Sequence, residues 1–157
     1  MEYSFNEGVQ TGENQALVLN ELIYSSDSTT KYLEELKKSN LRVSLERQIE
    51  LEFQNRTDIV RYSALYFGDK KNIVLYCTCI LNKGRLSKEE FQLIKAGEMP
   101  IGRIFLTSSD SVFKKENIKT SKITSTEIAK KLYTKNNVLH KKVYNLIVGC
   151  REIGIIA

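Results

Sequence analysis

Apolar residues in the first forty positions recur at the three- and four-residue intervals of amphipathic helices. The pattern predicts one helix over 15–24 and a second over 29–38, with Asp27 or Ser28 capping the second. The polar residues between them predict a tight turn, so the two helices should form a hairpin. Because the first amides of a helix have no intrahelical partner, those that open the second helix can bind an anion.

After residue 40 the apolar period changes to two, as in a strand with one face in water. A long strand is predicted over 41–54, with a bulge at Arg47–Gln48 where two alternating runs meet. Strands over 59–67 and 73–81 follow after short turns, so the three should form an antiparallel meander. The third is apolar at nearly every position, which predicts a central strand buried on both faces.

Ser87 and Glu90 have the spacing of a capping box, which predicts a helix that runs to about Ala96 and ends at Gly97. The rest of the chain is predicted to hold a polar, basic surface segment, a short helix and two strands, over 108–122, 126–133, 138–148 and 153–156.

The stretch between the capped helix and this surface segment contains the only proline, Pro100, and a glycine at 102. Pro100 fixes its own φ and pushes Met99 toward extended geometry. Gly102 permits a positive φ or the close approach of another group. The stretch is therefore either a turn that aims backbone amides at a ligand or an ordinary connection from a helix into an apolar strand over 104–106.

The composition, 41% hydrophobic and 27% charged, is that of one globular domain over residues 1–157, with residues 1–13 as a flexible lead-in. We expect no membrane association, because no stretch is apolar for long enough, and the start resembles neither a secretory nor a transit sequence. Cys77, Cys79 and Cys150 lack the spacing of metal or redox motifs, which indicates reduced thiols. With one histidine in the chain, we expect no structural metal.

The net charge of +5 comes from the C-terminal part, because residues 111–157 contain ten Lys and Arg but three acidic residues. Such a field could attract a small anion, keep the surface soluble or bind nucleic acid. The lysines are scattered and accompany no helix-turn-helix or aromatic-interleaved motif, so nucleic-acid binding is the least favoured of the three.

Arg61 stands out because it lies among apolar residues of the predicted strand 59–67. An arginine keeps its charge inside a protein, and its planar fork suits a carboxylate. Arg61 could instead face outward from the sheet or pair with Glu50 or Glu52 across the hairpin. The chain has no P-loop, no dinucleotide-binding glycine motif and no evident nucleophilic triad.

Three segments resemble the chorismate lyase family, in its bacterial, archaeal and plastid-encoded branches. Asp27-Ser-Thr-Thr-Lys31 is similar to that family's Asp-Ser-Met-Thr-Lys turn, and Ile59–Tyr62 is similar to the strand that carries its substrate arginine. Pro100-Ile-Gly-Arg103 and the run Phe105–Ser108 resemble its Pro-Leu-Gly-Arg loop and the strand after it. The order and spacing of the segments agree over roughly residues 15 to 148.

The resemblance implies a single α+β domain, with an antiparallel sheet of about six strands and flanking helices that enclose the ligand. It implies a cofactor-free elimination of pyruvate from chorismate that leaves 4-hydroxybenzoate, a precursor in quinone biosynthesis. Carried over by position, Arg61 would pair with the ring carboxylate, and the amides of Thr29 and Ile101, beside Gly102, would help to hold it. We expect a monomer that binds a small anion, in the cytoplasm or the plastid stroma.

The family's glutamate on the last strand is not matched. Placing Gly149 on the family's turn glycine puts that glutamate near Ile156. Glu152 could act as the general acid if the last strand is shifted, and the α-carboxylate of Ala157 is another candidate. The chain could also be an inactive relative that keeps the pocket. The alternative function is a non-catalytic aromatic-acid effector-binding module of the same fold.

Overall fold

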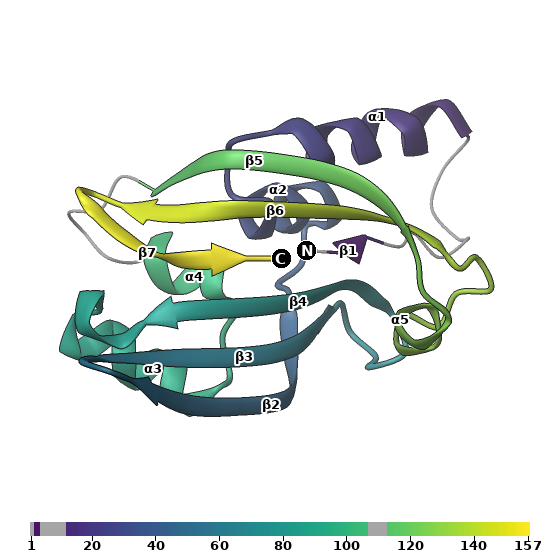
Figure 1. Cartoon of the computed structure of the whole chain (residues 1–157). Coiled ribbons are helices and arrows are strands. Elements are labelled where there is room, and N and C mark those ends of the chain that lie inside the picture. Colours follow the sequence, from purple (N-terminus) through teal and green to yellow (C-terminus); the bar gives the residue numbers. More distant parts are fainter. Residues whose placement is uncertain (1, 4–11, 107–112) are drawn as a thin grey trace.

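The structure, a computed structural model, describes residues 2–3, 12–106 and 113–157. In these residues the chain forms one antiparallel sheet with helices packed against it (Figure 1), which confirms the expected α+β fold. The strands are β1 (Glu2–Tyr3), β2 (Arg42–Phe53), β3 (Arg56–Tyr66), β4 (Ile73–Asn82), β5 (Phe113–Thr124), β6 (Val138–Val148) and β7 (Arg151–Ile156). The helices are α1 (Gly12–Tyr24), α2 (Thr29–Lys37), α3 (Lys88–Ala96), α4 (Ile101–Leu106), α5 (Thr126–Lys131) and the 3-10 turn η1 (Lys83–Arg85).

The strands follow the order β5-β6-β7-β4-β3-β2 across the sheet. The predicted meander of β2, β3 and β4 is confirmed. β7 fills the space between β6 and β4 at one end, and β1 pairs with the same two strands further along. β4 is therefore central and is buried along most of its length, as its apolar sequence predicts.

Helices α1 to α4 lie on one face of the sheet (Figure 1) and cover the larger hydrophobic core. α5 lies near one end of the sheet and packs on a smaller core, to which Ala64, Tyr66 and Leu132 belong. Because side chains alternate along a strand, Arg61, Ser63 and Leu65 of β3 point toward the larger core. β3 is consequently buried on both faces over its second half.

The predicted capping box on α3 is confirmed, with Glu90 N–H donating to Ser87 Oγ at 3.1 Å and Ser87 N–H donating to Glu90 Oε1 at 2.7 Å. Gly97 ends the helix with φ 72°. The Glu90 side chain is 3% exposed and accepts two hydrogen bonds from Arg151, at 2.6 and 3.1 Å. The same carboxylate thus caps α3 and ties it to the start of β7.

One prediction about local structure is wrong, and one correctly expects an exposed segment but leaves out its strand. Residues 101–106 form helix α4 rather than a strand at 104–106, because Pro100 is well suited to precede a helix and its carbonyl accepts the amides of Arg103 and Ile104. Ile101, Ile104 and Phe105 are all buried, at helical spacing. The expected surface segment 108–122 is strand β5 from Phe113 onward, and residues 107–112 lie outside the described part.

Two smaller expectations concern the bulge and the lead-in. The register of β2 against β3 shifts between Leu45 and Arg47, next to the predicted position. Of the lead-in, residues 1 and 4–11 lie outside the described part, while Glu2–Tyr3 form β1 and α1 begins at Gly12. Across the described ranges, no helix is both long enough and apolar enough to cross a membrane.

The contact between Glu90 and Arg151 generates a prediction about stability. Glu90→Gln should lower the free energy of unfolding at pH 7 by about 2 kcal/mol, since it weakens charge-assisted hydrogen bonds in a buried setting. Burial raises the pKa of Glu90, but the hydrogen bonds from Arg151 and Ser87 outweigh it, and the pKa falls below the ordinary 4.5. The carboxylate therefore stabilises the fold above pH 4.5. This contribution is lost as the pH falls through the lower pKa that Glu90 has in the folded protein.

Urea unfolding of both proteins between pH 3 and 7 checks this. The difference in the free energy of unfolding between wild type and Glu90→Gln should narrow below pH 4.5. Glu89→Gln, on the exposed face of the same helix, is the control and should change little. A gap that stays constant down to pH 3 would contradict the assignment.

Candidate functional site

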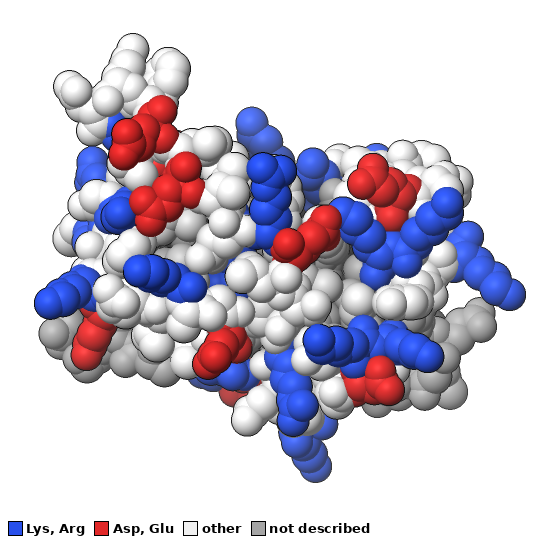
Figure 2. Space-filling view, turned by 90° about the horizontal axis from the view of Figure 1, so that it is seen from below, with Lys and Arg blue, Asp and Glu red and all other residues white. Residues whose placement is uncertain are grey.

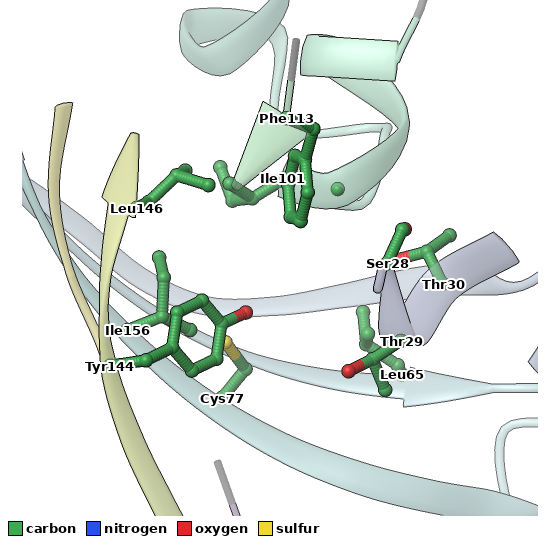
Figure 3. A pocket seen from close by; sticks show the side chains of 11 residues that line it. Ser28, Thr29, Thr30, Leu65, Cys77, Ile101, Phe113, Tyr144, Leu146 and Ile156 are labelled. Carbon is green, nitrogen blue, oxygen red and sulfur yellow. The ribbon is translucent and has the colours of Figure 1, made fainter. Parts of the chain in front are cut away.

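A small cavity lies between the sheet and the N-terminal ends of α2 and α4 (Figure 3). Its volume is about 20 Å³, which is room for about one water molecule. Thr29 and Ile101 line it from the two helices, and Tyr144 and Ile156 line it from the sheet. The cavity wall is mostly apolar, with hydroxyl groups on the side of α2.

The first turns of α2 and α4 meet at this cavity. Ser28 caps α2 by accepting the amide of Lys31 at 3.3 Å. The amides of Thr29 and Ile101 lie within the first turns, so neither has an acceptor within its own helix. A Cβ on Gly102 would lie 2.6 Å from Thr30 Oγ1 and 3.3 Å from Ser28 Oγ. Glycine is therefore needed at 102 for the two helices to approach so closely.

Arg61 shares a cross-strand row with two residues of the cavity floor but does not itself line the cavity. Its neighbour on β4 is Cys79, which is followed by Ile156 on β7 and Tyr144 on β6. The Arg61 side chain is 0% exposed. Its Nη2 donates to the carbonyl of Met99 at 2.8 Å, two residues before Ile101. Arg61 thus joins β3 to the loop that leads into α4.

The other two guanidinium nitrogens of Arg61, Nε and Nη1, are buried and have no hydrogen-bond partner in the described part of the chain. Both alternatives for Arg61 are wrong, because it does not face outward and lies opposite Gln48, while Glu50 pairs with Lys83 at 3.0 Å. Burial lowers the pKa of Arg61, but an arginine remains charged inside a protein. Arg61 is thus a buried cation whose Nε and Nη1 groups are available to donate hydrogen bonds to a ligand.

The thiols beside Arg61 do not neutralise it. Cys77 Sγ and Cys79 Sγ lie 3.4 Å apart, and both residues are buried. The hydrogen bond with Cys77, together with burial, raises the pKa of Cys79 well above its ordinary 9.0. Cys79 is therefore uncharged at neutral pH. None of the three cysteines forms a disulfide, and Cys150 is exposed.

Two buried lysines near the cavity were not found by sequence reasoning. Lys115 of β5 is 4% exposed, and its Nζ donates to Thr29 Oγ1 at 2.8 Å and lies 4.8 Å from the centre of the Tyr144 ring. Lys142 of β6 is 0% exposed and donates to the carbonyls of Leu22 and Ser25 at 2.9 and 2.5 Å. The sequence does contain a signal for the burial of Lys142. It lies two residues before Tyr144, and Leu146 and Val148 continue the same two-residue spacing along β6, so it shares their buried face.

The surroundings of Lys115 and Lys142 lower the pKa of both side chains. Burial, and then the charge of Lys142, lower the pKa of Lys115 to about 7. Burial lowers the pKa of Lys142 to about 8. Within residues 17–106 and 113–157, no carboxylate lies within 4 Å of Arg61 or Lys115 as an ion pair. This arrangement favours the binding of an anion.

Glu152, the sequence candidate for a general acid, is not brought to the cavity. It is exposed near the start of β7 and lies opposite Ile147. Ile156 occupies the cavity wall where the resemblance places the glutamate. Ala157 is engaged through its backbone, which exchanges two hydrogen bonds of 2.8 Å with Thr78. The described residues also contain no group of three His, Cys, Asp or Glu side chains that could hold a metal ion.

The close approach at Gly102 generates a prediction. Gly102→Ala should lower the free energy of unfolding by about 1–3 kcal/mol, since the added methyl group forces α4 away from α2. Thermal and urea unfolding measure it. Gly84→Ala is the control, because a Cβ there meets nothing closer than 3.4 Å. Equal stability of Gly102→Ala and wild type would mean that the two helices do not pack as closely as described.

Thr29, Ile101 and Gly102, which come from two helices far apart in the sequence, thus line one cavity, and Arg61 contacts the loop that leads into α4. Comparison with models of known protein families finds no match to this chain, and a search of curated protein sequences finds no relative.

Proposed function

We propose that this protein binds a small cyclic carboxylic acid, chorismate or 4-hydroxybenzoate, in the cavity between the sheet and helices α2 and α4. The ligand's ring carboxylate would pair with Arg61. The observation that carries the proposal is the state of this side chain, which is 0% exposed and has two nitrogens without a partner among the described residues. A buried donor left unpaired costs about 1–3 kcal/mol, and more when charged, so a carboxylate would gain that much by satisfying it.

The surroundings of Arg61 support an aromatic acid. The open amides of Thr29 and Ile101 and the positive ends of α2 and α4 favour a negative group nearby. Apolar side chains, among them Leu65 and Ile156, would contact a flat ring. Phe113 and Tyr144 offer ring faces for stacking.

Ligand entry requires the cavity to open, because about 20 Å³ does not hold a six-membered ring. Phe113 and Ser28 border both the cavity and an outer groove of about 360 Å³, which Asp27 and Tyr32 also line. Phe113 is only partly buried. Movement of its ring would join the two spaces, so we place the entry route there.

Chorismate turnover is the second part of the proposal. The elimination breaks the bond between the ring and the enolpyruvyl oxygen, removes a ring proton and forms 4-hydroxybenzoate and pyruvate. A proton donor near the departing oxygen would speed it. Ile156 cannot donate a proton and Glu152 is exposed, so this chain would need another donor. The same observation favours the second candidate function, a non-catalytic effector-binding module.

Nucleic-acid binding is less well supported. Lys115 and Lys142, two of the lysines that make the C-terminal part basic, are buried. On the face of the molecule in Figure 2, acidic and basic side chains are interspersed and form no continuous basic surface. A small anion therefore remains the proposed partner, in the cytoplasm or the plastid stroma, and a monomer is enough to complete the cavity.

Binding of 4-hydroxybenzoate tests the role of Arg61. Isothermal titration calorimetry should detect saturable binding to wild type, and Arg61→Gln should weaken it by roughly tenfold to a hundredfold through loss of charge-assisted hydrogen bonds. Arg56→Gln is the matched control, since Arg56 lies on the same strand with its side chain 53% exposed. Equal affinity of Arg61→Gln and wild type would refute the proposed site.

Chorismate turnover is tested by following pyruvate and 4-hydroxybenzoate together. Both should form in equal amounts, and faster in Ile156→Glu, which places a carboxylic acid at the cavity, than in wild type or the isosteric control Ile156→Gln. Absence of products from all three proteins, with 4-hydroxybenzoate still bound, would overturn the lyase in favour of the effector-binding module.

A further inference from the structure

We propose that Lys115 is a nucleophilic amine that condenses with the carbonyl group of a small 2-keto acid and holds it as an imine. This goes beyond the binding of an aromatic acid, since it assigns a covalent step to a residue that the proposed function does not use.

The position of Lys115 gives its amine access to the cavity. Nζ lies 2.8 Å from Thr29 Oγ1 and 4.8 Å from the centre of the Tyr144 ring, and both residues line the cavity. Figure 3 shows the Thr29 and Tyr144 hydroxyls pointing toward one another. The amine therefore lies directly behind two residues of the cavity wall, and the Lys115 side chain is held in one place by burial.

The two lysines of the pair have different partners. Lys142 donates to the carbonyls of Leu22 and Ser25 at the end of α1, where the helix dipole favours a positive charge. Lys115 donates a hydrogen bond to the hydroxyl of Thr29, and a hydroxyl can either accept a hydrogen bond or donate one. The bond to Thr29 thus survives when Lys115 loses its charge. A charged Lys142 nearby makes Lys115 the one that gives up its proton.

Several other groups act on the Lys115 amine. Lys142 of β6 opposes its charge, while Asp27, before α2, and Cys77 of β4 favour it. Asp27 is exposed, so water screens its effect. Burial is the largest influence and, with Lys142, lowers the pKa of Lys115 to about 7, which makes the uncharged amine that attacks carbonyl carbon accessible near neutral pH.

The chemistry needs only the amine and the keto acid. The nitrogen lone pair forms a bond to the carbonyl carbon, and a proton moves from nitrogen to the former carbonyl oxygen, giving a carbinolamine. Loss of that oxygen as water leaves the imine, so one water forms for each ketone consumed. A 2-keto acid is the proposed partner because its carboxylate would lie near the positive charge of Lys142, which is buried beside Lys115.

Reductive trapping tests the assignment. The full chain is incubated at pH 7 with pyruvate, a small 2-keto acid, then treated with sodium borohydride, and the modified lysines are located by peptide mass spectrometry. Lys115 should be modified at least about tenfold more than Lys114, its neighbour with a side chain 62% exposed. Similar modification of both lysines would overturn the proposal.

Variants separate a lost nucleophile from a lost fold. Lys115→Arg keeps the charge and much of the length but cannot form an imine, so it should fold and lose the adduct, whereas Lys114→Arg should keep it. Circular dichroism checks the fold, and an undiminished adduct in a folded Lys115→Arg would refute the assignment. Calorimetry with 4-hydroxybenzoate keeps the two proposals distinct: binding without an adduct overturns only the role of Lys115, and an adduct without binding overturns only the aromatic-acid site.

Discussion

The burial of positive charge on one face of the sheet is the constraint on which the arrangement of the helices depends. Arg61, Lys115 and Lys142 come from three different strands, and none of the three is more than 4% exposed. Each needs oxygen atoms in place of water, because an unsolvated charge costs several kcal/mol. The covering elements supply them through the carbonyl of Met99, the hydroxyl of Thr29 and the carbonyls of Leu22 and Ser25.

The strands and caps could be predicted because their signals are local. The meander follows from the two-residue alternation and short turns, and α3 from the capping box at Ser87. α4 was missed because a six-residue helix and a short apolar strand look alike in sequence. β5 was missed because much of its length is exposed and its register shifts between Glu116 and Lys119, where Asn117 has φ 52°. An exposed strand with such an interruption lacks a regular apolar period.

The site was predictable only where a residue contradicted its surroundings. Arg61 was found as a charge in an apolar strand, and Thr29, Ile101 and Gly102 through resemblance to a known family. Lys115 was missed because it belongs to the strand that was missed, and Lys142 because it follows another lysine in a basic run. Glu152 was considered because few carboxylates remain near the end of the sequence, but the turn at Gly149 leaves it exposed.

The small size of the cavity has a thermodynamic consequence. If the open form is a minor population, the observed affinity equals the intrinsic affinity multiplied by that population. A ligand would therefore report on two quantities, the strength of its contact with Arg61 and the free energy needed to move Phe113. Side chains that pack against Phe113 would set the second quantity without touching the ligand. Binding strength in this fold would thus depend on residues outside the site as well as on those within it.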